Sequence, residues 1–507
     1  MGKYALKRLG IGLVAVLLST VAVMVMVYGL LDKNLIFADD PVFSRQRHNA
    51  LEVYKMQQWE NFSYVDYISF GEYAPGAVLG DTPAQDGAAR ETVENFTREY
   101  EAKGYTVTRL DAVYRAGTRK YQEGGEPRLF AWREIPVMNR LWSFLTGLIQ
   151  IDHLGRAEGI PDAERKLTFT LRDPVYGGKF APAVMGNGTY HRYLLYFDGE
   201  FPYIHQNFIR LQLGRSYSVN TGIDVVQTLT EKQGSYDYRQ VIYPTGLTEQ
   251  SADNLHSAVY VRGSLDSGGE ALKARFDSDY TGVTTYKKGL SRLGYSFVIG
   301  ILAAVLSYLI AIPVATGMAL RKDGLLDKAG TAFIVFIIAV PSLGYIFLFK
   351  ALGGALGLPV TFDMESPGWQ QYVLPVVSLA LPAAAGLMKW HRRYMVDGLR
   401  GEYVRFARSQ GYSTWQILWK QVVKNAAIPI VHGIPGSVLG ALVGAIITER
   451  VYVVPGAGNL LTRAINRYDN GVIVGMTAFY ALLGVLSVIL GDLLMAKVDP
   501  RIRLENK

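Results

Sequence analysis

The sequence contains few residues whose type and spacing could support catalysis. A phosphate-binding loop of the form GxxxxGK(S/T) is absent, and the nearest fragment, residues 178–180, lacks the hydroxyl side chain that would hold magnesium. An HExxH zinc motif is also absent, and the seven histidines are scattered along the chain. We therefore predict no catalytic residue, no bound cofactor and no metal site here, and we predict that this chain is not an enzyme.

Ionisable side chains are rare within the long apolar stretches of the sequence. Lys350, Glu449 and Asp492 lie near the expected ends of such stretches, where a charged side chain ordinarily extends toward the membrane interface. No series of carboxylates crosses the middle of a stretch, as an ion-driven carrier would need. If the protein transports a solute, its energy must therefore come from another source.

The basic, aromatic-rich segment 402–429 is the best candidate for a functional surface. Its first part can form a short helix with Tyr403, Phe406 and Ala407 on one side. Arg405 and Arg408 would share another side of that helix. Such a helix suits docking of a partner protein, and the alternative is an amphipathic helix that lies on the membrane surface.

Gly411 is expected to end this short helix, because glycine readily adopts the left-handed conformation that turns the chain. A second amphipathic stretch, residues 415–423, then leads into the next apolar stretch.

Six apolar stretches are long enough to cross a bilayer, which takes about 20 helical residues. They lie at 9–31, 293–320, 329–352, 372–388, 428–448 and 472–496. The first is too long for the apolar region of a cleaved signal peptide, so we interpret it as a retained helix. An even number of spans places both termini on the same side of the membrane.

The distribution of basic residues predicts which side that is. The loop at 353–371 has Asp363 and Glu365 but no basic residue, whereas the loops after the second, fourth and sixth spans are basic. Those loops contain Arg321, Lys322, Lys328, Lys389, Arg392, Arg393, Arg400, Arg405, Arg408, Lys420, Lys424, Lys497, Arg501, Arg503 and Lys507. The positive-inside rule then places both termini in the cytoplasm and residues 32–290 outside.

Three regions follow from this topology. Residues 1–31 form the cytoplasmic N-terminus and first transmembrane helix, and 32–290 form an extracellular domain. Residues 291–507 form the membrane core, with transmembrane helices 2–6 and a cytoplasmic loop at 389–429. Residues 32–290 hold about 29 basic and 33 acidic residues of the totals of 52 and 44, so the basic excess belongs to the membrane part. Because these basic residues flank apolar spans, a nucleic-acid partner is not expected.

The extracellular segment is expected to fold as an α+β domain. Residues 88–105 have the pattern of an amphipathic helix, and 105–114 and 166–172 alternate as strands do. Residues 264–279 are polar and contain glycine, which is typical of a mobile link back to the membrane.

Gly436, Gly440 and Gly444 recur at every fourth residue of the fifth span. Small residues at this spacing allow another helix to approach closely, either within this chain or in a second subunit.

The segment 402–429 resembles the EAA coupling loop of permease subunits in type I ABC importers. Arg405, Phe406 and Ala407 occupy the EAA positions, although only Ala407 and Gly411 match the general pattern. The peptide-transporting branch fits better, with YVR at 403–405, AR at 407–408 and NAAIP at 425–429. TERVY at 448–452, PGAG at 455–458 and DPR at 499–501 also resemble that branch. The enlarged outer segment is similar to the Opp/Ami-type oligopeptide permeases of Gram-positive bacteria, in their first permease subunit.

This resemblance implies an all-α polytopic membrane bundle of six transmembrane helices with an inserted α+β extracellular domain, located in the plasma membrane. It implies a second, homologous permease subunit and two cytoplasmic ABC ATPase subunits that bind ATP and magnesium. A lipid-anchored extracellular peptide-binding protein would deliver oligopeptides. The residues that would couple the permease to the ATPases are Tyr403, Arg405, Phe406, Ala407, Arg408 and Gly411.

Two alternatives remain open at this stage. The substrate could instead be a dipeptide, nickel or glutathione, which related permeases import. The protein could also be a membrane sensor or scaffold that binds a peptide without transporting it.

Overall fold

The computed structural model describes residues 2–38, 40–151, 161–172, 180–186, 193–196, 209–218, 222–243, 245–255, 274–275, 283–364 and 368–498. Most of the expected link at 264–279 and the DPR sequence at 499–501 lie outside these residues.

Five long helices have the length and hydropathy needed to cross a membrane. They are α1 (Gly2–Leu30), α8 (Arg292–Leu320), α11 (Gln370–Leu399), α14 (Lys424–Tyr452) and α16 (Asn470–Val498). They confirm five of the predicted spans, although α11 continues well beyond residue 388, so the first third of the expected loop at 389–429 is helical.

The predicted third span, residues 329–352, is not one continuous helix. It consists of α9 (Leu325–Ala339) and α10 (Ser342–Ala355), whose axes differ by 114°. The break is at Val340 and Pro341: Val340 has an extended backbone, as a residue before proline prefers, and Pro341 has no N–H to donate to the helix. Counted as one broken span, the pair brings the number of candidate spans in the described residues to six.

Short helices connect the long ones. They are α12 (Glu402–Ser409) and α13 (Thr414–Ile417), a π-helical turn (Leu418–Val423) that joins α13 to α14, and α15 (Ala457–Asn466) between α14 and α16.

The outer segment combines helices and strands, as expected. Its helices are α2 (His48–Asn61), α3 (Phe70–Tyr73), α4 (Arg90–Ala102), α5 (Val137–Gly147) and α6 (Val225–Thr230). Its strands are β1 (Val65–Ser69), β2 (Thr106–Leu110), β3 (Arg128–Glu134), β4 (Ile149–Ile151), β5 (Leu167–Arg172), β6 (Phe180–Gly186), β7 (Tyr193–Tyr196), β8 (Ile209–Leu211), β9 (Arg239–Ile242), β10 (Thr248–Ser251), β11 (Asp253–Leu255) and β12 (Val283–Thr285). The helix expected at 88–105 and the strands expected at 105–114 and 166–172 correspond to α4, β2 and β5.

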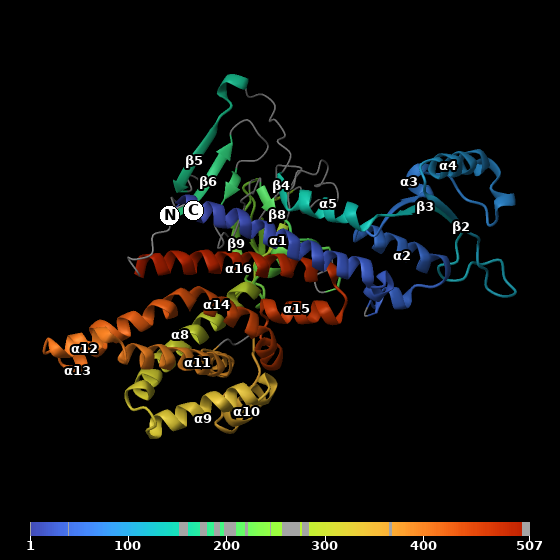
Figure 1. The fold of residues 1–507 in the computed structure, drawn as a ribbon. Coiled ribbons are helices and arrows are strands. Elements are labelled where there is room, and N and C mark those ends of the chain that lie inside the picture. The colour runs from blue at the N-terminus through green and yellow to red at the C-terminus, as the bar shows by residue number, and fades with distance from the viewer. Residues whose placement is uncertain are drawn as a thin grey trace.

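Strands β1, β3 and β2 form an antiparallel sheet in that order, and we call residues 33–134 the outer unit. Phe37, Trp59, Tyr67 and Phe130 form one buried cluster of this unit. Phe96 of α4 is fully buried on the opposite face of this sheet, where it packs with Phe70 and the neighbouring aromatic rings. In Figure 1 the outer unit and the pair α12–α13 lie at opposite ends of the molecule.

The start of α1 and the end of α16 lie together, since the Tyr4 hydroxyl donates a hydrogen bond of 2.7 Å to Asp492. Arg8 lies 3.8 Å from the same carboxylate. Asp492 therefore pairs within the protein, and Lys350 likewise donates to the carbonyl of Val451 at 2.7 Å. The sequence analysis expected these charged groups to extend toward the membrane interface, and the structure adds that both also bind partners within the protein.

For Glu449 that interpretation is wrong, because its side chain is fully buried. Its carboxylate accepts hydrogen bonds from the Ser296 hydroxyl of α8 and from the Asn459 backbone N–H of α15, the latter at 2.9 Å. The Ser296 oxygen in turn accepts from the Ala457 N–H at 2.8 Å. Glu449 and Ser296 thus cap the N-terminus of α15 by accepting hydrogen bonds from its first N–H groups.

Asp469 joins the outer segment to the membrane helices. It is fully buried and accepts from the Ser216 and Ser218 hydroxyls at 2.8 and 3.0 Å and from the Tyr217 and Ser218 N–H groups. Its other oxygen accepts from the Val472 N–H in the first turn of α16. One carboxylate therefore fastens the loop at 212–224 to the corner between α15 and α16.

Candidate functional site

Helix α12 presents an exposed aromatic and basic surface at one end of the molecule. Phe406 is 65% exposed and Tyr403 is 37% exposed, and Arg405 and Arg408 are exposed as well. Ala407 is buried, so it does not share a face with Phe406 as the sequence suggested. The buried face is instead formed by Ala407 and Val404, which the sequence analysis did not select.

The buried face of α12 rests on several helix ends. Val404 and Ala407 pack in one cluster with Ala319 at the end of α8 and Met395 in the last part of α11. Ile417, Leu418, Val422 and Ala426, which lead into α14, complete this cluster. We call it the platform. Because it joins three long helices to α12, a displacement of α12 must also move these helix ends.

Gly411 ends α12 as predicted, with a φ of +84° in the left-handed region. The Gly411 N–H donates to the Arg408 carbonyl at 3.0 Å, and the Tyr412 N–H donates to the Ala407 carbonyl at 3.2 Å. These two bonds form a complete Schellman motif, in which glycine is favoured because it has no Cβ.

The next turn starts a new helix immediately. Ser413 and Gln416 form a capping box: the Gln416 N–H donates to the Ser413 hydroxyl, and the Ser413 N–H donates to the Gln416 side chain. Trp415 and Trp419 stack edge to face with ring centroids 5.5 Å apart and remain 65% and 49% exposed. The expected amphipathic stretch at 415–423 is therefore present, although part of it is π-helical.

Together these side chains form what we call the docking surface: Tyr403, Arg405, Phe406, Arg408, Tyr412, Trp415 and Trp419. Exposed aromatic rings next to arginines are enriched at the centres of protein interfaces. The two tryptophans were visible in the sequence, but their spacing did not reveal that they would stay exposed beside α12.

The glycine stripe of α14 faces away from the rest of this chain at two of its positions. A Cβ added at Gly436 or Gly440 would have no atom within 4 Å, and both residues are exposed. Packing within this chain therefore does not account for these two glycines. A role for Gly436, Gly440 and Gly444 in contacting a second subunit stays a prediction.

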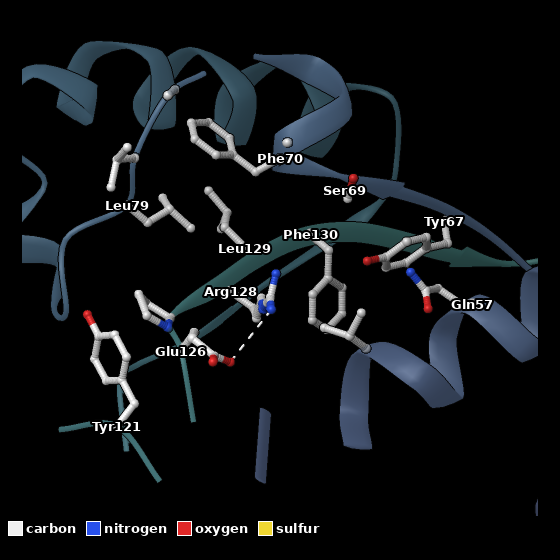
Figure 2. A pocket seen from close by; sticks show the side chains of 15 residues that line it. Gln57, Tyr67, Ser69, Phe70, Leu79, Tyr121, Glu126, Arg128, Leu129 and Phe130 are labelled. Carbon is white, nitrogen blue, oxygen red and sulfur yellow. Dashed lines mark ion pairs between the residues drawn. The ribbon is translucent and has the colours of Figure 1, made fainter. Parts of the chain in front are cut away.

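A second candidate site, a pocket of about 470 Å³, lies in the outer unit. Figure 2 shows Phe70, Leu79 and Leu129 on one side of it and Tyr67 and Gln57 on another. Burial raises the pKa of Tyr67 to about 12, so its hydroxyl remains a neutral hydrogen-bonding group at physiological pH.

A charged pair lies at the mouth of this pocket. Glu126 and Arg128 lie 3.6 Å apart and are about half exposed, so their interaction contributes little to stability (Figure 2). The neighbouring apolar Val78 is 82% exposed. The pocket thus combines an apolar interior with polar groups at its rim, which suits a protein segment or a small organic ligand. Sequence patterns gave no sign of it, because its lining comes from widely separated segments.

Comparison with known proteins places the membrane part in a family. Residues 296–504 match the family described as "Binding-protein-dependent transport system inner membrane component". The oligopeptide transport system permease protein AmiC of Streptococcus pneumoniae is 33% identical over 513 aligned residues, which cover 100% of this chain and 99% of AmiC. The similarity to AmiC therefore includes the outer segment.

Other relatives match a smaller part of the chain. The dipeptide transport system permease protein DppB of Bacillus subtilis is 30% identical over 42% of this chain and 68% of its own length. The oligopeptide transport system permease protein OppB of Mycobacterium tuberculosis is 26% identical over 46% of this chain and 78% of its own. A chain of the MetNI methionine ABC transporter superposes with a TM-score of 0.34 and 14% identity over 40% of this chain, too distant to add to the argument.

Proposed function

Because this chain belongs to the family of binding-protein-dependent transport system inner membrane components, we propose that it is one of two permease subunits of an ATP-driven oligopeptide importer. The observation that carries this proposal is the similarity to AmiC along the whole chain, outer segment included. The similarity to the dipeptide permease DppB covers less than half of the chain, so a dipeptide is the weaker choice of substrate.

Energy enters this subunit through the docking surface. The sequence has no phosphate-binding loop of its own, so two cytoplasmic ATPase subunits bind ATP and magnesium and hydrolyse the nucleotide. Helix α12 sits in a groove of one ATPase, with Phe406 and Tyr403 providing apolar contact area and Arg405 and Arg408 providing charge. When the ATPases close, α12 moves, and the platform carries that motion to α8, α11 and α14.

The membrane arrangement supports this scheme. The contact between Tyr4 and Asp492 joins the ends of α1 and α16, and the basic loops predict that both termini are cytoplasmic. Residues 32–290 are then extracellular, in keeping with the position of the outer unit at the end opposite α12 (Figure 1). A homologous second permease completes the pathway, and the exposed positions Gly436 and Gly440 are candidates for its contact surface.

The outer unit docks the external lipid-anchored protein that delivers oligopeptides. The family description itself includes a binding protein, and the pocket lies at the end of the molecule where that protein would arrive. An exposed side chain of the binding protein fills the pocket beside Val78, and polar groups at the rim pair with its neighbours.

Purification of the tagged protein from its own cells tests the assembly. We expect two ATPases, a sister permease and an extracellular lipoprotein to copurify, and we expect the reconstituted complex to import oligopeptides at the expense of ATP. Recovery of the chain without any ATPase would refute the importer and would favour a membrane sensor.

Paired variants separate the two ends of the molecule. Phe406→Ala should weaken ATPase binding and leave capture of the binding protein intact, whereas Val78→Arg should do the reverse. If each variant lost both the ATPase and the binding protein, the assignment of these two docking sites would be wrong. Peptide uptake by the unmodified complex would still support the importer itself.

A further inference from the structure

Helix α5 (Val137–Gly147) belongs to the outer segment but packs along a membrane-spanning helix. Its Leu141 is buried in one cluster with Met24 of α1 and Val474 of α16. Figure 1 shows α5 running alongside the half of α1 that leads into the outer segment. Met24 precedes Leu31, the last residue of the charge-free run, by a helical distance of about 10 Å. The contact therefore lies within the membrane-spanning length of α1, toward the end that leads into the outer segment.

The rest of the α5 surface is divided into two edges. Met138 and Trp142, one helical turn apart, are 67% and 68% exposed and form what we call the apolar edge. Asn139, Ser143 and Thr146 are also exposed and form the polar edge. A helix with one face packed on protein, one exposed apolar edge and one exposed polar edge is suited to the boundary between lipid and water.

The one charged residue of α5 is directed toward protein. Arg140 donates a hydrogen bond of 3.0 Å to the Tyr64 carbonyl, and its guanidinium carbon lies 4.6 Å from the centre of the Tyr64 ring. Tyr64 belongs to the outer unit, so this charge is directed toward protein groups and away from the apolar edge.

The exposed apolar surface continues beyond the helix. Ile149 of β4 is 57% exposed, and Leu211, its directly opposed partner in β8, is 63% exposed. Opposed residues of an antiparallel pair lie on the same face of the ribbon, so these two side chains form one apolar patch.

We propose that the apolar edge of α5 inserts into the membrane at the boundary between headgroups and acyl chains, on the side that carries the outer segment. Lipid fits this edge better than another protein does, because the polar edge directly beside it requires water and α1 below it requires lipid. Trp142 suits the position, since tryptophan is enriched at membrane interfaces, where its ring is apolar and its N–H reaches polar groups. The outer segment is thereby held against the bilayer beside α1. This inference requires only that α1 crosses the membrane, and it does not depend on the substrate.

The absence of cysteine from the chain allows a direct test. Trp142→Cys and Met138→Cys would each be labelled with an environment-sensitive fluorophore in the complete transporter, reconstituted into nanodiscs of phosphatidylcholine and phosphatidylglycerol. Asn139→Cys on the polar edge and Glu101→Cys on α4 of the outer unit are the controls, and the unsubstituted chain gives the background from cysteines in other subunits. Quenching by 5-doxyl phosphatidylcholine and by aqueous iodide would then be compared.

We expect labels at 142 and 138 to lose most of their emission to the doxyl lipid and little to iodide, with the opposite result at 139 and 101. Retained ATP hydrolysis in the labelled complexes would show that they are folded, and two independent positions protect against failure of one variant. Strong iodide quenching at both 142 and 138 would overturn the proposal, because the edge would face water. Protection of both labels from both quenchers would also overturn it, because another subunit would cover the edge.

Discussion

Replacement of Phe406 by alanine is the most direct perturbation of the docking surface. Phe406 is 65% exposed, and an aromatic side chain has about 200 Å² of surface, so about 130 Å² is available to a partner. Burial of that area is worth at most about 3 kcal/mol at about 25 cal/mol per Å². We therefore expect Phe406→Ala to weaken binding of the ATPase subunits by up to about a hundredfold.

The same substitution should leave the protein's stability unchanged. Phe406 points away from the platform, so its removal creates no cavity, and the melting temperature in detergent should match that of the unmodified chain. The matched control is Trp369→Ala, an aromatic residue that is 75% exposed at the opposite end of α11. Affinities would be measured by titrating fluorescent ATPase subunits into the permease pair in nanodiscs. Wild-type affinity of Phe406→Ala, or an equal loss for Trp369→Ala, would refute the coupling role of α12.

Three further substitutions test the local structure around the two ends of the bundle. Gly411→Val should destabilise the end of α12 by about 1–2 kcal/mol, because a residue with a Cβ is strained at φ +84°. It should also lower peptide-stimulated ATP hydrolysis more than the control Gly411→Asn, because asparagine tolerates the left-handed conformation better than valine does. Glu449→Ala should lower the free energy of unfolding by about 2–3 kcal/mol, because the Asn459 N–H and the Ser296 hydroxyl lose a buried acceptor; an unchanged melting temperature would contradict this. Asp469→Ala should loosen the loop that contains Ser216 and Ser218, because both hydroxyls lose their acceptor. Limited proteolysis should then cleave the outer segment faster, while the rate of cleavage in α12 should stay the same.

The long membrane helices could be predicted because apolar stretches of this length have few other stable environments. Gly411 could be predicted as well, since a glycine after a short amphipathic segment has a specific conformational role. The break at Pro341 was harder to foresee, because proline is tolerated in many membrane helices and only the surrounding packing decides whether it bends or ends one. The buried face of α12 was also misjudged. Eight residues with apolar side chains on several sides do not specify which side meets the platform.

Glu449 and Asp469 show why charges at the ends of spans resist interpretation from sequence. The sequence suggested an interfacial position for Glu449 and gave no role to Asp469, yet each caps the N-terminus of a helix, α15 and α16 respectively, and each binds a residue far away in the chain. Glu449 reaches Ser296 of α8, and Asp469 reaches Ser216 of the outer segment, contacts that no local pattern encodes. A consequence for coupling follows. The outer segment contacts the bundle at the α15–α16 corner, through α6 on α8 and α16, and through α5 on α1 and α16, whereas α12 meets it at the platform. The contact at Asp469 is one of these routes from the outer segment to the bundle, so variants at Asp469 should reduce stimulation of ATP hydrolysis by the binding protein without reducing basal hydrolysis.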